Sequence, residues 1–115
     1  MKPPLPSRGE IWLVDLGNPI GHEQAGKRPC LVISVDYFNH GPAELHVVIP
    51  MTTREKHIPL HVEAGPKETG LSKRGFLKCD DVRSISRQRF VKRLGTLSPA
   101  TVMGVEEQLR RLLGL

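Results

Sequence analysis

Polar and charged residues gather at three places in this sequence, each where a predicted strand meets a loop. One group ends a long loop near the N-terminus, and the other two follow the third and fifth predicted strands. The groups are His22, Glu23, Gln24, Lys27 and Arg28; Thr52, Thr53 and Arg54; and Lys78, Asp80, Asp81 and Arg83. In a small barrel such junctions can meet at one rim. We therefore consider these residues together as one candidate site.

The side chains in these groups suit chemistry on an anionic substrate. A guanidinium binds phosphate oxygens in pairs, a threonine hydroxyl donates a hydrogen bond, and an imidazole exchanges protons near neutral pH. The whole chain is basic, with 17 Lys and Arg against 12 Asp and Glu and a formal net charge of +5. Such a charge favours nucleic acid or an acidic peptide as partner, although a modest excess also serves solubility alone.

Other classes of site are disfavoured. The sequence contains no Walker loop and no GxGxxG, GxSxG or HExxH motif. The histidines lack compact metal-ligand spacing, because His57 and His61 fall on a predicted strand that contains Pro59. Cys30 and Cys79 belong to no metal motif either. We expect no metal, no cofactor and two reduced, buried thiols, although the sequence alone also permits a disulfide.

The length of 115 residues corresponds to one domain. Residues 1–7 carry three prolines and are interpreted as a flexible N-terminal lead, followed by a single domain over residues 8–115. No apolar run reaches the roughly 18 residues that span a membrane, and the N-terminus lacks the apolar core of a signal peptide. We therefore expect a cytoplasmic protein that does not associate with membranes.

Short apolar runs rich in β-branched residues predict about six strands. They cover residues 10–16, 28–35, 45–50, 58–63, 76–79 and 91–97. The run 28–35 is apolar almost throughout, which is typical of a central strand buried on both faces. Pro59 indicates a strand at the sheet edge, and Gly95 suggests a bulge. Residues 17–27 and 65–75 are predicted loops, and residues 80–85 a turn or short extended segment.

The C-terminal segment predicts one helix. Ser98 is a favourable N-cap, Pro99 fits the first turn, and Gly114 ends the helix. Apolar side chains recur on one helical face, at Val102, Val105, Leu109 and Leu112. The fold class is therefore mainly β (α+β), a small half-open barrel of short strands with a C-terminal α-helix.

Four segments of the sequence resemble the MazF/PemK family of toxin–antitoxin endoribonuclease toxins. They are residues 8–16 (RGEIWLVDL), 21–34 (GHEQAGKRPCLVIS), 48–53 (VIPMTT) and 75–85 (GFLKCDDVRSI). The spaced GHEQ-x-G-x-RP block is the specific part of the match, which extends to the C-terminal helix.

The resemblance implies an SH3-like barrel that forms a homodimer and binds single-stranded RNA in a groove at or near the dimer interface. It also implies sequence-specific cleavage without a metal, through attack of the RNA 2′-hydroxyl, which leaves a 2′,3′-cyclic phosphate and a 5′-hydroxyl. The expected protein partner is a cognate antitoxin whose acidic C-terminal tail fills the groove.

Two catalytic residues follow most directly from the resemblance. Arg28 matches the arginine of the family's Arg-Pro pair, and its guanidinium would stabilise charge on the phosphoryl group in the transition state. Thr52 matches the threonine after the third strand, and its hydroxyl would donate to the scissile phosphate. The alternatives are a salt bridge at a strand end for Arg28 and a hydrogen bond to the backbone for Thr52.

Three further catalytic candidates carry the proton transfers. Asp80 matches the base in family members that read Arg-Cys-Asp, where burial would have to raise its pKa. Lys78 stands in place of the arginine in that triplet and lacks its planar fork. His22 of the GHEQ block titrates near neutral pH. A surface ion pair is the alternative for Asp80 and Lys78, and plain solvation is the alternative for His22.

The remaining site residues are candidates for contact with RNA. They are Gln24, Lys27, Thr53, Arg54, Phe76 and Arg83. Phe76 could stack on a base, although a phenylalanine on a strand is more often part of the core. Trp12 is interpreted as a residue of the core or of the dimer interface.

Two other functions remain open at this point. A toxin of the same fold could act without catalysis by binding a protein such as a DNA topoisomerase, which would make Arg28 and Thr52 incidental. The chain could also be a plain RNA-binding module, since Lys78 departs from the family pattern.

Overall fold

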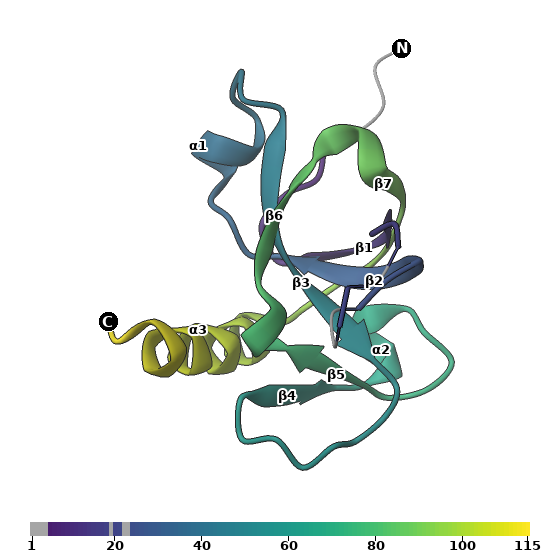
Figure 1. The fold of residues 1–115 in the computed structure, drawn as a ribbon, viewed down its shortest axis with the longest axis vertical. Coiled ribbons are helices and arrows are strands. Elements are labelled where there is room, and N and C mark those ends of the chain that lie inside the picture. The colour runs from purple at the N-terminus through teal and green to yellow at the C-terminus, as the bar shows by residue number, and fades with distance from the viewer. Residues whose placement is uncertain (1–4, 19, 22–23) are drawn as a thin grey trace.

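A single curved antiparallel sheet of seven strands forms the body of the protein in the computed structural model, which describes residues 5–18, 20–21 and 24–115 (Figure 1). The strands are β1 (Glu10–Asp15), β2 (Lys27–Val32), β3 (Leu45–Thr52), β4 (His61–Ala64), β5 (Gly75–Lys78), β6 (Arg83–Ser86) and β7 (Phe90–Thr96). The helices are α1 (Asp36–Asn39), α2 (Pro66–Thr69) and α3 (Pro99–Leu113), with 3-10 turns η1 (Cys79–Asp81) and η2 (Arg87–Arg89). The predicted mainly-β class with a C-terminal helix is confirmed.

Strand β3 organises the sheet. The strand order is β4-β5-β3-β2-β1-β7, and β6 pairs with β3 outside this path. The first half of β3 pairs with β6, from Leu45 opposite Ser86, whereas its last residues pair with β5, with Thr52 opposite Phe76. The end of β3 therefore lies beside the first half of β5, with Thr52 next to Phe76.

Two apolar clusters form the core, one on each face of the sheet. The first contains Ile11, Leu31, Ile33, Ile49, Met51, Ala64, Leu77, Cys79, Leu97 and Val105, and the second contains Trp12, Val14, Leu16, Cys30, Val32, Val48 and Ile85. Neighbouring residues of β2 alternate between them, with Cys30 in the second cluster and Leu31 in the first. This alternation explains why the run 28–35 is apolar almost throughout, and it confirms the prediction of a central strand buried on both faces, although β2 ends at Val32.

Helix α3 has the predicted caps. The Ser98 side chain accepts a hydrogen bond from the backbone N–H of Thr101, and Gly114 has a φ of +71° at the C-terminal end. Val105 is fully buried against the first cluster, and Val102 and Leu109 pack beside it. No helix among residues 5–18, 20–21 and 24–115 is long and apolar enough to cross a membrane.

The structure differs from the predicted elements in several places. Strand β4 begins at His61, so Pro59 precedes it, although β4 does end the strand order as an edge strand should. The predicted loop 65–75 contains α2, and the segment 80–85 contains η1 and β6. The ladder between β1 and β7 shifts register beside Gly95, as a bulge requires. A Cβ at Gly95 would collide with the Glu68 carbonyl oxygen of α2.

Part of the predicted N-terminal lead contacts the domain. Pro6 is buried, and the Ser7 N–H donates to Glu10 Oε1 at 2.7 Å. Both cysteines are free and buried, as predicted, and burial raises the pKa of each thiol to about 12. They are therefore unreactive as nucleophiles near neutral pH.

Candidate functional site

A polar cavity of about 440 Å³ opens where the first long loop meets the ends of β2 and β3. Its lining residues are Gly21, Gln24, Arg28, Thr52, Thr53, Arg54 and Lys56. Strands β2 and β3 are antiparallel, with Cys30 opposite Pro50. The same register, continued by two residues toward the cavity, sets Arg28 opposite Thr52. The structure thus brings the first two polar groups of the sequence to one place.

Arg28 is exposed at the start of β2. Its Nε donates to the carbonyl oxygen of Ala25 at 3.1 Å, which anchors the near end of the guanidinium to the loop. In the described part of the chain, its two Nη atoms have no hydrogen bond or ion pair. A guanidinium held in this way presents its outer N–H groups to an incoming anion.

Thr52 ends β3 and is only 8% exposed. Its Oγ1 accepts a hydrogen bond from the Arg54 N–H at 3.2 Å, which fixes the hydroxyl at the cavity wall. Because the oxygen already accepts this bond, its own hydrogen is left to donate to a bound group. Thr53 and Arg54 are exposed and line the same cavity.

The long loop is fastened to the sheet by Asp81 and Arg83. Asp81 Oδ2 accepts from the Gln24 N–H at 3.1 Å and lies 2.7 Å from Arg83 Nη2, which also donates to the Gln24 carbonyl oxygen at 3.0 Å. Both side chains are largely buried, at 14% and 21% exposure. Arg83 therefore holds the backbone beside the cavity rather than reaching into it. Asp81 belonged to the third polar group, but sequence reasoning assigned it no role.

Lys78 and Asp80 do not line the cavity of Arg28 and Thr52. Lys78 is only 5% exposed, and its Nζ lies 4.0 Å from Asp81 Oδ2. The Asp80 carboxylate is partly exposed and lies 3.1 Å from Nε2 of His61 on β4. The structure therefore pairs Asp80 with a histidine that sequence reasoning did not select.

The other predicted RNA contacts fall in different places. Lys27 is exposed on β2 opposite Asp15. Phe76 is 5% exposed, and the Arg74 guanidinium lies 5.6 Å from its ring centroid. The ring therefore offers little open face for stacking. His22 lies outside the described residues, next in sequence to the cavity-lining Gly21.

Lys56 is a cavity residue that sequence reasoning missed. The available signal was its position shortly after Thr52-Thr53-Arg54, in a polar segment expected to be a loop. Together with Arg28 and Arg54 it gives the cavity three cationic side chains. Within the described ranges, no group of three or more His, Cys, Asp or Glu side chains could hold a metal ion.

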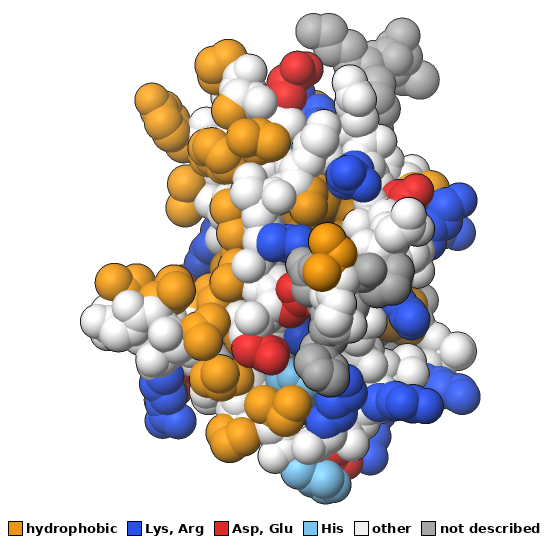
Figure 2. Space-filling model, viewed as in Figure 1, with side chains coloured by type: hydrophobic (Ala, Val, Ile, Leu, Met, Phe, Trp, Pro, Cys, Tyr) orange, Lys and Arg blue, Asp and Glu red, His pale blue; other side chains and the backbone are white. Residues whose placement is uncertain are grey.

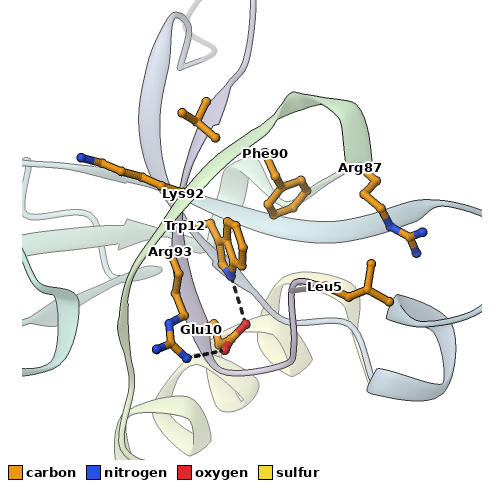
Figure 3. A pocket seen from close by; sticks show the side chains of 8 residues that line it. Leu5, Glu10, Trp12, Arg87, Phe90, Lys92 and Arg93 are labelled. Atoms are coloured by element: carbon orange, nitrogen blue, oxygen red, sulfur yellow. Dashed lines mark hydrogen bonds and ion pairs between the residues drawn. The ribbon is translucent and has the colours of Figure 1, made fainter. Parts of the chain in front are cut away.

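A second cavity of about 440 Å³ is lined by side chains of the paired strands β1 and β7, together with Leu5 and Arg87 (Figure 3). The Trp12 and Phe90 rings form its apolar wall in an edge-to-face pair with centroids 5.8 Å apart. The Glu10 carboxylate accepts from Trp12 Nε1 at 3.0 Å and from Arg93 Nη1 at 3.2 Å. Arg87, Lys92 and Arg93 surround this wall, so the cavity is apolar inside and cationic at its edge.

Comparisons with known proteins agree with one another. The family described as "PemK-like, MazF-like toxin of type II toxin-antitoxin system" matches residues 7–113. Endoribonuclease EndoA of Bacillus subtilis is 30% identical over 109 residues, covering 94% of both chains. Endoribonuclease MazF of Staphylococcus epidermidis is 31% identical, covering 94% of this chain and 91% of that protein.

Solved structures show the same similarity in three dimensions. A crystal structure of MazF from Deinococcus radiodurans superimposes with a TM-score of 0.85 at 30% identity, covering 98% of this chain and all 100% of that one. A Mycobacterial endoribonuclease in complex with its cognate antitoxin superimposes with a TM-score of 0.79 at 27% identity, covering 96% of each chain. Each similarity covers nearly the whole of this chain.

Proposed function

The chain belongs to the PemK/MazF family of type II toxin–antitoxin toxins, and from that premise we propose that it is an endoribonuclease that cuts single-stranded RNA at specific sites without a metal ion. The observation that carries this proposal is the meeting of Arg28 and Thr52 at one polar, cationic cavity. A protein that acted only by binding another protein would not need this pair in a cationic cavity.

Cleavage of RNA by its own 2′-hydroxyl sets the requirements of the site. The hydroxyl loses a proton and attacks phosphorus, the non-bridging oxygens gain negative charge, and the leaving 5′-oxygen takes up a proton. Arg28 stabilises the developing charge through its outer N–H groups, and the Thr52 hydroxyl donates to a phosphoryl oxygen. The Ala25 carbonyl oxygen holds the Arg28 side chain, and the Arg54 N–H holds the Thr52 hydroxyl, before RNA binds. The two side chains therefore need to move less as the transition state forms.

Proton transfer falls to His22 in this proposal. Its sequence neighbours Gly21 and Gln24 line the cavity, whereas Asp80 is engaged with His61 and lies outside the lining. An imidazole accepts and donates protons near neutral pH, which a carboxylate exposed to water does poorly. Lys78 acts indirectly, through Asp81, on the position of the loop.

The proposal is tested by incubating purified protein with a long unstructured RNA in excess EDTA. We expect cuts at a short recurring sequence, with 2′,3′-cyclic phosphate and 5′-hydroxyl ends identified by mass spectrometry. A substrate with a 2′-deoxynucleotide before the cleaved bond should stay intact, because it lacks the nucleophile. Intact RNA in every reaction, with the protein shown to be folded, would contradict the proposal and favour a toxin that binds a protein target.

We also propose that the active form is a homodimer. Large hydrophobic side chains are exposed along one side of the molecule, from α1 to the end of α3, where Figure 2 shows them together. This apolar face contains Val35, Tyr37, Leu45, Leu112, Leu113 and Leu115, of which Tyr37 is 94% and Leu115 85% exposed. A face of this kind is typical of an interface with another chain.

The second proposed protein partner is an antitoxin with an acidic segment. Complexes of related toxins with MazE or with a cognate antitoxin have this fold. Cationic residues line the Arg28 cavity, so an acidic segment would compete there with RNA. The cavity of Trp12 and Phe90 supports the proposal, since its apolar wall and cationic edge suit an apolar side chain on the same segment.

Trp12 provides a direct readout, because it is the single tryptophan of the chain. We expect an acidic antitoxin peptide with a large apolar residue to change Trp12 fluorescence and to inhibit RNA cleavage over the same concentration range. Inhibition with unchanged fluorescence would place the peptide away from the Trp12 cavity.

A further inference from the structure

A smaller cavity of about 150 Å³ adjoins the cavity of Arg28 and Thr52. It lies between the segment after β3 and strands β4 and β5, and it is lined by Glu55, Lys56, His57, Ile58, His61, Glu63 and Phe76. Lys56 lines both cavities, and Phe76 pairs with Thr52 across β5 and β3. A ligand whose phosphate reached Arg28 would therefore place its next group beside this smaller cavity.

Two carboxylates at this cavity are both paired with Arg74. Arg74 lies between them, with Nη2 3.6 Å from Glu55 Oε1 and Nη1 3.2 Å from Glu63 Oε1. The second oxygen of Glu55 lies 3.8 Å from His57 Nδ1. The second oxygen of Glu63 has no hydrogen bond or ion pair with any described residue. Glu63 is therefore an oriented acceptor that can still receive donors from a ligand.

A buried histidine supplies a second acceptor. The His61 side chain is only 4% exposed, and its Nε2 lies 3.1 Å from Asp80 Oδ1. Its Nδ1 is buried and finds no hydrogen-bond partner among residues 5–18, 20–21 and 24–115. If Nε2 carries the proton that it donates to Asp80, Nδ1 presents a lone pair. Buried polar atoms in folded proteins are nearly always paired, so we expect a hydrogen-bond donor from a ligand to pair with His61 Nδ1.

We propose that this cavity binds a guanine base of the RNA beside the cleaved bond, an inference that rests on the proposed ribonuclease function. Guanine carries three hydrogens on its Watson–Crick edge, at N1 and N2, and the O6 acceptor lies next to them. Two acceptors, Glu63 and His61, and one cation, Lys56, match that pattern. The adjacent N1–H and N2–H groups of guanine can pair with both oxygens of one carboxylate. Adenine and cytosine place a ring-nitrogen lone pair beside their amino group, and uracil places carbonyl oxygens beside its N–H, so each would set an acceptor against the second oxygen of Glu63.

The strained backbone of the loop agrees with a binding role. His57 has a φ of +54°, in the left-handed region that residues other than glycine seldom adopt. Such strain persists where the surrounding structure fixes it, and it is found more often at ligand sites. His57 lies in the loop between Glu55 and Ile58, whose residues line the cavity.

The test uses wild-type protein and RNAs that differ at a single base. After the cleavage sites are mapped, the guanosine nearest the cut is replaced by inosine, which lacks the N2 amino group, or by 7-deazaguanosine, which keeps the Watson–Crick edge. We expect inosine to lower kcat/KM about tenfold, the effect of one lost hydrogen bond to a charged acceptor, and 7-deazaguanosine to leave it unchanged. Glu63→Gln should reduce the difference between guanosine and inosine, and Glu107→Gln on the exposed face of α3 is the matched control.

The guanine pocket and the ribonuclease activity can be tested separately. Cleavage sites that share no guanine at a fixed position, or equal rates with guanosine and inosine, would overturn the guanine pocket and leave the ribonuclease in place. If no RNA is cut, binding of the RNAs is measured directly. Equal affinity for guanosine and inosine forms then overturns the pocket as well, whereas tighter binding of the guanosine form supports it.

Discussion

One buried side chain, His46, is expected to make the stability of the protein depend on pH. His46 on β3 is fully buried, with Nδ1 3.2 Å from Asn39 Oδ1 and with Nε2 accepting from Arg87 Nε at 3.4 Å. Burial, together with the positive charges of Arg87 and, when protonated, His40, lowers the pKa of His46 to about 4. The folded protein therefore keeps this imidazole neutral, while the unfolded chain protonates it at its ordinary pKa.

We predict a loss of stability in mild acid that depends on His46. Because the pKa is lower in the folded state, the unfolded state binds the proton first, and stability falls as pH drops from about 6.5 toward 4. The free energy of unfolding should decrease by about 2–3 kcal/mol between neutral pH and about pH 4.5. Urea unfolding at both pH values measures it. His46→Gln should flatten the dependence, and an equal pH slope in both proteins would contradict the assignment.

Asp81 is a second single residue with an expected effect, because it holds the long loop that contributes Gln24 to the Arg28 cavity. Its contacts with the Gln24 N–H and with Arg83 connect the loop to the sheet across 57 residues of sequence. We predict that Asp81→Ala lowers kcat for RNA cleavage about tenfold or more, because small displacements of catalytic groups are costly. Asp81→Asn, which keeps an acceptor for Gln24, should retain more activity than Asp81→Ala. Equal activity of Asp81→Ala and wild type would show that the loop does not depend on this contact.

At the scale of elements, helix α3 contains a glycine, Gly104, that alanine should replace with a gain in stability. Gly104 lies in the middle of α3, and a Cβ there would meet no atom within 4 Å. We predict that Gly104→Ala raises the free energy of unfolding by about 0.5–1 kcal/mol, since alanine loses less backbone entropy in a helix. Chemical denaturation measures the change, with activity as the control. A destabilised variant would indicate that another chain packs against this position.

The elements show what the sequence could predict. Strand β2 was predictable because its apolar run is nearly continuous. Helix α3 was predictable because its apolar residues recur with a helical period and because Ser98 and Gly114 cap its ends. Helices α1 and α2 and strand β6 have four residues each, too few for a period to emerge. The shared site of Arg28 and Thr52 was also predictable, because each residue lies where a predicted strand meets a loop. The partners of Asp81 and Asp80 depend on contacts distant in sequence, which no local pattern contains.

At the scale of the whole molecule, we expect the apolar face beside α1 and α3 to form the interface of the proposed dimer. We predict a dimer in analytical ultracentrifugation and its dissociation by Leu113→Asp, because a carboxylate would lose its water in the interface. Val91→Asp is the matched control, since Val91 is 50% exposed on β7 and lines the Trp12 cavity instead. Equal dimerisation of both variants would place the interface elsewhere.

The most direct test of the central claim is the kinetic role of Arg28. Single-turnover cleavage of one mapped RNA should be compared for wild type, Arg28→Ala and Arg111→Ala, which removes an exposed arginine of α3 that pairs with Glu107. We predict that Arg28→Ala slows cleavage about 10²–10³-fold, the usual cost of one donor to a developing oxyanion, while RNA affinity changes little. Arg111→Ala should cleave like wild type. Wild-type rates in a folded Arg28→Ala variant would show that the cavity of Arg28 and Thr52 is not where the RNA is cut.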